Sequence, residues 1–320
     1  LQSTALALGL VIGILNAGTV FAADKKQNRA TGQTDRPIGF AVSIGTELMS
    51  GDSTDAIGGV ATYADGGSEN FHFPISELEW PLDIWLARAD AGINIGSAWR
   101  ISGTIKTNIS DPNDNMIDKD WFTSNPAQVD VYSESNISDF SASIWDIDIE
   151  WAFLQRQSWN LYAGLGYQYQ KFEYDGQLIQ QYSPSYPGNE IYGDGSVGIT
   201  YDMEYTMLYF LIGTDYAITP RLTLSGSFAY SPWVDAEDED NHLLRAKVAQ
   251  GDMDGDAYML DLSGTYNFFS SWFLEGGFQY TKIDVDGKQT QSFSGIPFGK
   301  IDMESESTQG SGYLNIGYKF

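Results

Sequence analysis

The chain has 320 residues, no cysteine and a formal net charge of −26 at pH 7. The lack of cysteine excludes a disulfide framework and thiol chemistry. The negative charge argues against a nucleic-acid partner, which needs a basic surface, and favours cationic partners. Mean hydropathy is −0.26, a value that suggests a water-soluble protein, but a membrane barrel hides its lipid-facing residues in such an average because polar lumen-facing residues alternate with them.

Residues 4–22 form an apolar stretch that ends in small residues. Val20 and Ala22 take the −3 and −1 positions of a signal-peptidase site, so residues 1–22 are expected to be a secretory signal peptide. The basic start of such a peptide is missing from the printed chain, which is therefore expected to be clipped there. The alternative is a short membrane helix or a buried core helix. Residues 23–37 are polar and expected to be mobile.

From about residue 38 onward the dominant pattern is a two-residue alternation, which is typical of β-strands. Within 144–153, Trp145, Ile147 and Ile149 fall on one face, and Asp146 and Asp148 on the other. Mid-strand carboxylates are costly in the dry core of a sandwich but tolerable where one face meets a polar barrel lumen. The pattern therefore favours a membrane barrel over a soluble sandwich.

The last strand supports the same fold, because Leu314, Ile316, Tyr318 and Phe320 alternate up to the end of the chain. An amphipathic final strand that ends in an aromatic residue resembles the assembly signal of outer-membrane barrels.

Connections of two lengths separate the expected strands. Short ones are predicted near 96–97, 156–158, 219–220 and 270–271, and long acidic loops near 65–70, 111–135, 176–195, 234–243 and 286–305. In outer-membrane barrels short turns are periplasmic and long loops extracellular. We therefore predict an all-β, transmembrane antiparallel barrel of about ten strands over residues 38–320, with both ends periplasmic.

The chain contains only two histidines, His72 and His242. Asp240 lies two residues before His242, so in an extended strand both side chains point to the same face. A neighbouring carboxylate polarises an imidazole and makes it a candidate general base. His72 lies in Phe-His-Phe-Pro within an expected strand and is interpreted as structural.

Asp118 and Asp120 repeat this i, i+2 spacing, and two carboxylates on one face tend to share a proton and can hold a water. The pair Asp118 and Asp120 follows the third expected strand, and the pair Asp240 and His242 follows the seventh. In a ring of about ten strands the two pairs could therefore face each other across the mouth. By composition alone, a solvated acidic loop, a weak calcium site and a surface histidine remain alternatives.

The stretch Asp118-Lys119-Asp120-Trp121 with its following Ser-Asn-Pro, and the later Pro-Trp-Val…Asp-x-His, resemble the omptin family of outer-membrane proteases. The resemblance covers essentially the whole barrel. It implies an endopeptidase in which Asp240 and His242 form a dyad and Asp118 and Asp120 a couple. Together these activate a water without an acyl-enzyme. Asn241 stands where many members carry Glu, on the face away from the dyad.

The resemblance also implies cleavage beside or between basic residues of cationic peptides or proteins. Asp238 and Asp55 are expected to hold the substrate cation, with Asp55 replacing a family Glu, and Asp130 to bind the residue after the cut. No metal or organic cofactor is implied.

A second implied ligand is lipopolysaccharide, bound on the outer barrel wall as an activating lipid. Tyr167 matches a family aromatic, and Lys171 replaces an Arg, which keeps the charge but loses the bidentate fork. Two further basic positions align with Glu204 and Ala249. We therefore expect weaker dependence on this lipid than in relatives.

Several alternatives stay open. The chain could be an inactive omptin-like barrel that serves as a porin, adhesin or structural protein, or a lipid-A-modifying barrel enzyme. A monomer in the bacterial outer membrane, with the site facing outward, is expected. The acidic stretch 251–256 resembles a calcium loop but lacks the terminal Glu spacing, so a β-bulge or a lumen-facing acidic strand is expected there.

Overall fold

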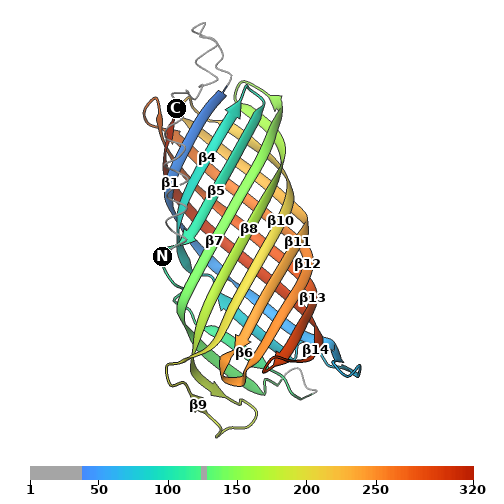
Figure 1. Ribbon diagram of the computed structural model, residues 1–320. Helices are drawn as coiled ribbons and strands as arrows, with labels where there is room; N and C mark the ends of the chain where they lie inside the picture. Colours follow the sequence, from blue (N-terminus) through green and yellow to red (C-terminus); the bar gives the residue numbers. More distant parts are fainter. Residues whose placement is uncertain (1–37, 124–127) are drawn as a thin grey trace.

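The computed structural model describes residues 38–123 and 128–320. The expected signal peptide (1–22), the segment 23–37 and the Ser-Asn-Pro motif at 124–126 lie outside the described residues. The described chain winds as one antiparallel sheet into a tall, tilted barrel (Figure 1). The predicted all-β barrel is therefore confirmed.

Ten long strands form the ring, and the first pairs with the last. They are β1 (Ile38–Tyr63), β4 (Ile84–Ile95), β5 (Trp99–Asn108), β7 (Val131–Gln155), β8 (Trp159–Tyr182), β10 (Val197–Ala217), β11 (Leu222–His242), β12 (Lys247–Asn267), β13 (Trp272–Phe293) and β14 (Ile296–Lys319). Pairing of β1 with β14 closes the sheet, which removes the edges along which an open sheet could aggregate.

Four short strands complete the wall at one end, the bottom in Figure 1: β2 (Ser68–Asn70), β3 (Ser76–Pro81), β6 (Met116–Asp120) and β9 (Ile191–Tyr192). β3 pairs with β1 just beyond the point where β4 stops, and β6 connects β3 to β7. β3 and β6 therefore continue the second and third ring positions beyond the ends of β4 and β5. This places β6 at the mouth, opposite the seventh ring strand, β11.

The four predicted short turns are confirmed. At each of them one strand ends and the next begins within a few residues of the predicted position. The prediction of long loops at 234–243 and 286–305 was wrong. The first range belongs to β11 and the second to the β13–β14 hairpin, whose tip lies between Phe293 and Ile296. Alternating carboxylates on the outer face of these strands had given them the composition of loops.

An apolar belt surrounds the half of the barrel near the short turns. Ile44, Ile147 and Leu314 point outward and are 60%, 54% and 61% exposed. On the same strand as Ile147, Asp148 and Glu150 face the lumen, as the alternation predicted. An outward apolar belt with a polar interior is the arrangement of membrane barrels. Within the described residues, no helix has the length and apolarity needed to cross a membrane.

The sidedness reverses in the other half of the barrel. On β10, Leu208 and Phe210 point outward into the belt, whereas farther along the strand Met203 and Tyr205 point inward and are buried. Inward side chains of this kind, from most of the ring strands, form one continuous hydrophobic core. The end of the barrel beyond the belt is therefore packed like a water-soluble protein, and this core supports the mouth.

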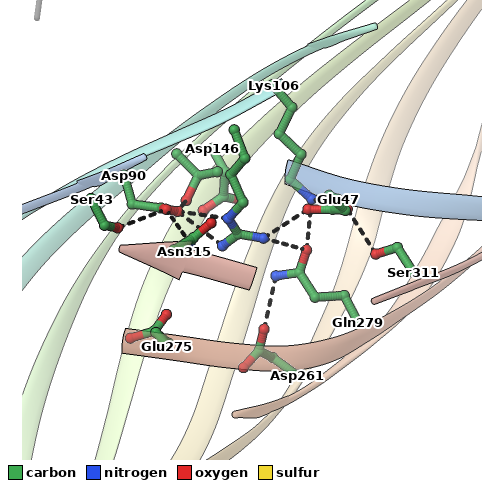
Figure 2. Close-up of polar contacts among 12 residues, drawn as sticks. Ser43, Glu47, Asp90, Lys106, Asp146, Asp261, Glu275, Gln279, Ser311 and Asn315 are labelled. Carbon is green, nitrogen blue, oxygen red and sulfur yellow. Dashed lines mark hydrogen bonds and ion pairs between the residues drawn. The ribbon is translucent and has the colours of Figure 1, made fainter. Parts of the chain in front are cut away.

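A network of ion pairs crosses the lumen at the level of the belt (Figure 2). Glu47 is fully buried and accepts hydrogen bonds from Lys106 (2.8 Å), Arg88 (2.9 Å) and the Ser311 hydroxyl (2.7 Å). Gln279 accepts from Lys106 at 2.6 Å. Because the charges satisfy one another from several strands, the network crosses the lumen and cross-links its wall.

The stretch 251–256 belongs to β12, and the expectation of a lumen-facing acidic strand was wrong. An irregularity of register does occur here, but on the partner strand β11, between Ser231 and Val234, opposite Asp256. Asp252 and Asp254 are exposed on the outer face, and Met253 between them is buried in the core. Among residues 38–123 and 128–320, no group of three or more acidic, histidine or cysteine side chains could hold a metal ion.

Candidate active site

The dyad lies at the end of β11, where the strand emerges above the core. His242 Nε2 is 2.9 Å from Asp240 Oδ2, and the two side chains are 9% and 2% exposed. Their i, i+2 spacing puts both on the inner face, as predicted. Asn241 between them points outward and donates to Glu239 at 3.0 Å. The substitution of Asn for a family Glu therefore leaves the dyad face unchanged.

The carboxylate couple lies on β6. Lys119, between Asp118 and Asp120, turns to the other face, where it pairs with Glu77 (2.8 Å) and Glu79 (3.5 Å). The two aspartates are thus left on one face without their neighbouring cation. One oxygen of Asp118 is buried and has no hydrogen-bond partner among the residues that the structure describes.

The dyad and the couple form one electrostatic unit. Burial and then repulsion from Asp120 raise the pKa of Asp118 to about 8, and Asp240 contributes in the same direction. Burial also raises the pKa of Asp120, against the opposing charges of Arg245 and other cations. At neutral pH the couple consequently holds a proton between its two carboxyl groups.

Sequence reasoning missed Arg245, which lies three residues after His242 in the one-turn 3-10 helix η1 (Leu243–Arg245). Its Nη2 is 2.6 Å from His242 Nδ1. Side chains three residues apart eclipse each other in such a turn, which brings the guanidinium over the imidazole. The signal available in the sequence was a cation at i+3, but it could be used only with the turn known.

A second acidic cluster, called the acidic pocket below, consists of two buried and interacting carboxylates, Asp55 of β1 and Asp238 of β11, which are 4% and 6% exposed. The Tyr201 hydroxyl donates to Asp55 Oδ2 at 2.5 Å, and the Gly251 N–H donates to Asp238 Oδ1 at 2.6 Å. The other oxygen of each carboxylate is buried and lacks a hydrogen-bond partner within the described chain.

Both carboxyl groups of the pocket have raised pKa values. Burial raises the pKa of Asp55 to about 6. Burial, with repulsion from Asp55 and then Asp240, raises that of Asp238 well above its ordinary range. Burial disfavours the ionised form of each carboxyl group, and a cation bound beside the two groups would favour that form again.

An aromatic stack supports this pocket and was not predicted. Trp80 of β3 is fully buried. Its ring lies 4.6 Å from that of Tyr201 at an interplanar angle of 7°, and 4.9 Å from that of Tyr174. Stacking on Trp80 orients the tyrosine that binds Asp55. These strands are distant in the sequence, so no local pattern could predict the contact.

Two other predicted residues have different surroundings. Asp130 Oδ2 accepts the backbone N–H groups of Phe122 and Thr123, both at 2.8 Å, and these bonds lower its pKa. This carboxylate closes its own loop, and its contact with a substrate stays a prediction. His72 lies in the connection between β2 and β3, so its placement within a strand was wrong.

On the outer wall, Tyr167 is 39% exposed at the edge of the belt. Lys171 pairs with Glu204 at 3.0 Å and with Glu173 at 3.3 Å. Ala249 is fully buried and faces inward, so its alignment with a lipid-binding position was wrong. The lysine expected to meet lipid phosphate is thus already neutralised by carboxylates of the protein.

A closed antiparallel barrel with an apolar outer belt, bearing a buried His–Asp pair and a carboxylate couple at one mouth, defines an outer-membrane barrel with a site suited to acid–base chemistry. The family model described as "Omptin family" matches residues 37–293. The plasminogen activator of Yersinia pestis is 23% identical over 261 residues, covering 80% of each chain.

Among solved structures, the outer membrane protease OmpT from Escherichia coli aligns with a TM-score of 0.65 at 18% identity. The alignment covers 90% of this chain and 99% of that one, and it supports the fold. The chain belongs to the omptin family, a family of bacterial outer-membrane proteases.

Proposed function

We propose that the protein is an endopeptidase that cleaves cationic peptides or proteins at or between basic residues. One observation supports this most directly. Four buried carboxylate oxygens, from Asp55, Asp118, Asp238 and Asp240, have no hydrogen-bond partner in the part of the chain that is described. Unsatisfied buried acceptors are costly, and a water and a substrate cation would satisfy them.

In the proposed reaction His242 is the general base. Asp240 accepts the Nε2–H, which leaves Nδ1 to take a proton from the attacking water. The resulting hydroxide adds to the peptide carbonyl, and the buried Asp240 carboxylate stabilises the imidazolium. Asp118 holds the water, and Asp120 shares the proton of the couple. The proton on His242 then passes to the leaving amine as the peptide bond breaks. Because water is the nucleophile, no acyl-enzyme forms. The chain's own residues suffice for each of these steps.

The pocket of Asp55 and Asp238 is proposed to hold the basic residue of the substrate. A guanidinium can reach two carboxylates with its planar fork, so arginine is expected to be preferred over lysine. Asp130 is proposed, with less structural support, for the residue after the cut. We propose a monomer whose site faces the cell exterior, with lipopolysaccharide as an activating lipid bound near Tyr167 and Lys171.

The test is cleavage of a fluorogenic dibasic peptide by His242→Ala and Asp118→Asn. Loss of a general base reduces the rate by about 10²-fold or more. Asn241→Ala is the matched control, because this side chain lies between the dyad residues but points outward. Heat-modifiable migration on a gel checks that each variant folds. Full activity in folded His242→Ala would remove the proposed mechanism and favour an inactive barrel.

Two alternatives have less support. A porin needs an open lumen, whereas the Glu47 network crosses it (Figure 2) and the hydrophobic core occupies the half of the barrel beyond it. A lipid-modifying enzyme needs a site at the lipid surface. The dyad lies nine residues farther along β11 than Trp233, which is 60% exposed at the edge of the apolar belt.

A further inference from the structure

The contact between Arg245 and His242 has a chemical consequence for the resting site. An arginine side chain carries a positive charge and has only donors, and its Nη2 lies 2.6 Å from His242 Nδ1 and 3.5 Å from Nε2. The other ring nitrogen, Nε2, faces the Asp240 carboxylate, which only accepts. The guanidinium therefore lies against the ring nitrogen that Asp240 leaves free.

The same contact occupies the only nitrogen available to a general base. Proton transfer from water would put a proton on Nδ1, which an arginine N–H already faces. The two states exclude each other, so the guanidinium has to withdraw before the ring can act.

The local structure permits such a withdrawal. Arg245 is exposed, and Leu243–Ala246 form a tip with little packing above the core. Ala246 adopts a left-handed conformation (φ 48°) and accepts a backbone hydrogen bond from Ser294 at 2.7 Å. The backbone of the turn is held by the neighbouring hairpin, while the long side chain of Arg245 can change rotamer at the rim.

The charges near this side chain explain why it rests against the imidazole. Asp118 and Asp120 of β6 interact electrostatically with Arg245, and Asp240 of β11 contacts the imidazole; Lys247 of β12 is a further cation near the two β6 aspartates. A guanidinium is attracted to this acidic mouth in the absence of substrate. A basic side chain of a substrate carries the same charge and competes for the same field.

We propose that Arg245 masks the general base of the resting enzyme and is displaced when a cationic substrate enters. This inference rests on the proposed function. It makes the β11–β12 turn an autoinhibitory contact, in which only the fraction of molecules with Arg245 withdrawn can react.

The first experiment does not need peptidase activity. Diethylpyrocarbonate modifies unprotonated imidazole nitrogens, and mass spectrometry distinguishes His242 from His72, the only other histidine. Arg245→Ala is expected to raise the modification rate of His242 about tenfold, the gain for a resting protein that is about nine-tenths masked. Lys247→Ala removes a neighbouring cation without touching the ring and is expected to change the rate less than twofold. Arg245→Met keeps the bulk without donors and should behave like Arg245→Ala.

The second experiment measures kcat/KM for a short dibasic peptide. A similar tenfold rise is expected in folded Arg245→Ala and Arg245→Met, but not in Lys247→Ala. An unchanged His242 modification rate would overturn the mask, and a fall in kcat/KM would show that Arg245 assists catalysis instead. If no variant and no wild-type protein cleaved peptide, the proposed function would fail, while the modification rates would still decide whether the mask exists.

Discussion

The acidic pocket can be tested by replacing Asp55 and Asp238 with asparagine, singly and together. Burial raises the pKa of Asp55 to about 6 and holds that of Asp238 well above its ordinary range. Near neutral pH the pair therefore carries less negative charge than two exposed aspartates would. Each single substitution leaves one ionisable carboxyl group, and the removal of its neighbour lets that group ionise more easily.

The expected losses are therefore far from additive. Each single variant should lose less than about tenfold in kcat/KM for a peptide with arginine at the cleavage site, because one charge persists. The double variant would leave the guanidinium buried without a partner, a loss of about 3–5 kcal/mol. That corresponds to a fall of about 10²–10³-fold or more.

The assay compares an arginine peptide with the same peptide carrying norleucine, which has no charge. Only the arginine peptide should distinguish the variants, so a general collapse of the site is controlled for. The wild-type preference for arginine should also decline as pH falls through about 6, since Asp55 then gains a proton. Full and equal losses in both single variants would refute the shared-charge pocket.

Three further predictions concern stability and lipid. Asp118 binds its proton more tightly when folded, with a pKa of about 8, so its ionisation costs stability as pH rises from about 4 toward 8; Asp118→Asn should raise the heat-modification midpoint at pH 7 and leave it unchanged at pH 4. Activity should respond weakly to added lipopolysaccharide, and strict dependence of the wild type at low micromolar lipid would contradict this. Glu204→Gln removes the shorter of the two ion pairs of Lys171, at 3.0 Å, and leaves the one with Glu173 at 3.3 Å, so it should lower the half-saturating lipid concentration. Arg88→Ala should destabilise the folded protein by about 3–5 kcal/mol in urea titrations in lipid vesicles, because it leaves the buried Glu47 carboxylate underpaired, whereas Ser311→Ala should cost less.

The barrel could be predicted from local periodicity, and spacing indicated the pairs Asp240–His242 and Asp118–Asp120, whose assignment to one site came from the resemblance to the omptin family. Alternation marks a strand, and i, i+2 spacing places Asp240 beside His242 without knowledge of the whole fold. The loop predictions at 234–243 and 286–305 failed because acidic residues on the outer face resemble loop composition.

The remaining site features depend on contacts that no local pattern specifies. Trp80 stacks on Tyr201 across the barrel, and Arg245 reaches His242 only through the particular turn that joins β11 to β12. The inward orientation of Ala249 depends on the register between β11 and β12. The sequence similarity to the family is weak there, and an alignment shifted by one residue assigns a strand side chain to the opposite face of the barrel. Ala249 was therefore predicted on the outer face instead of the inner one.

The reversal of sidedness along β10 means that one strand is subject to two opposite substitution rules. At Leu208 the outward position meets lipid, so a charged replacement should be rejected, whereas the outward Glu204, four residues earlier, is charged already. Inward positions follow the converse rule, because Met207 belongs to the core and Tyr209 binds the Asp146 carboxylate in the lumen. The kind of side chain that each face tolerates, polar or apolar, should therefore switch at the same height on every strand. A deep mutational scan would then locate the membrane boundary around the barrel from the protein alone.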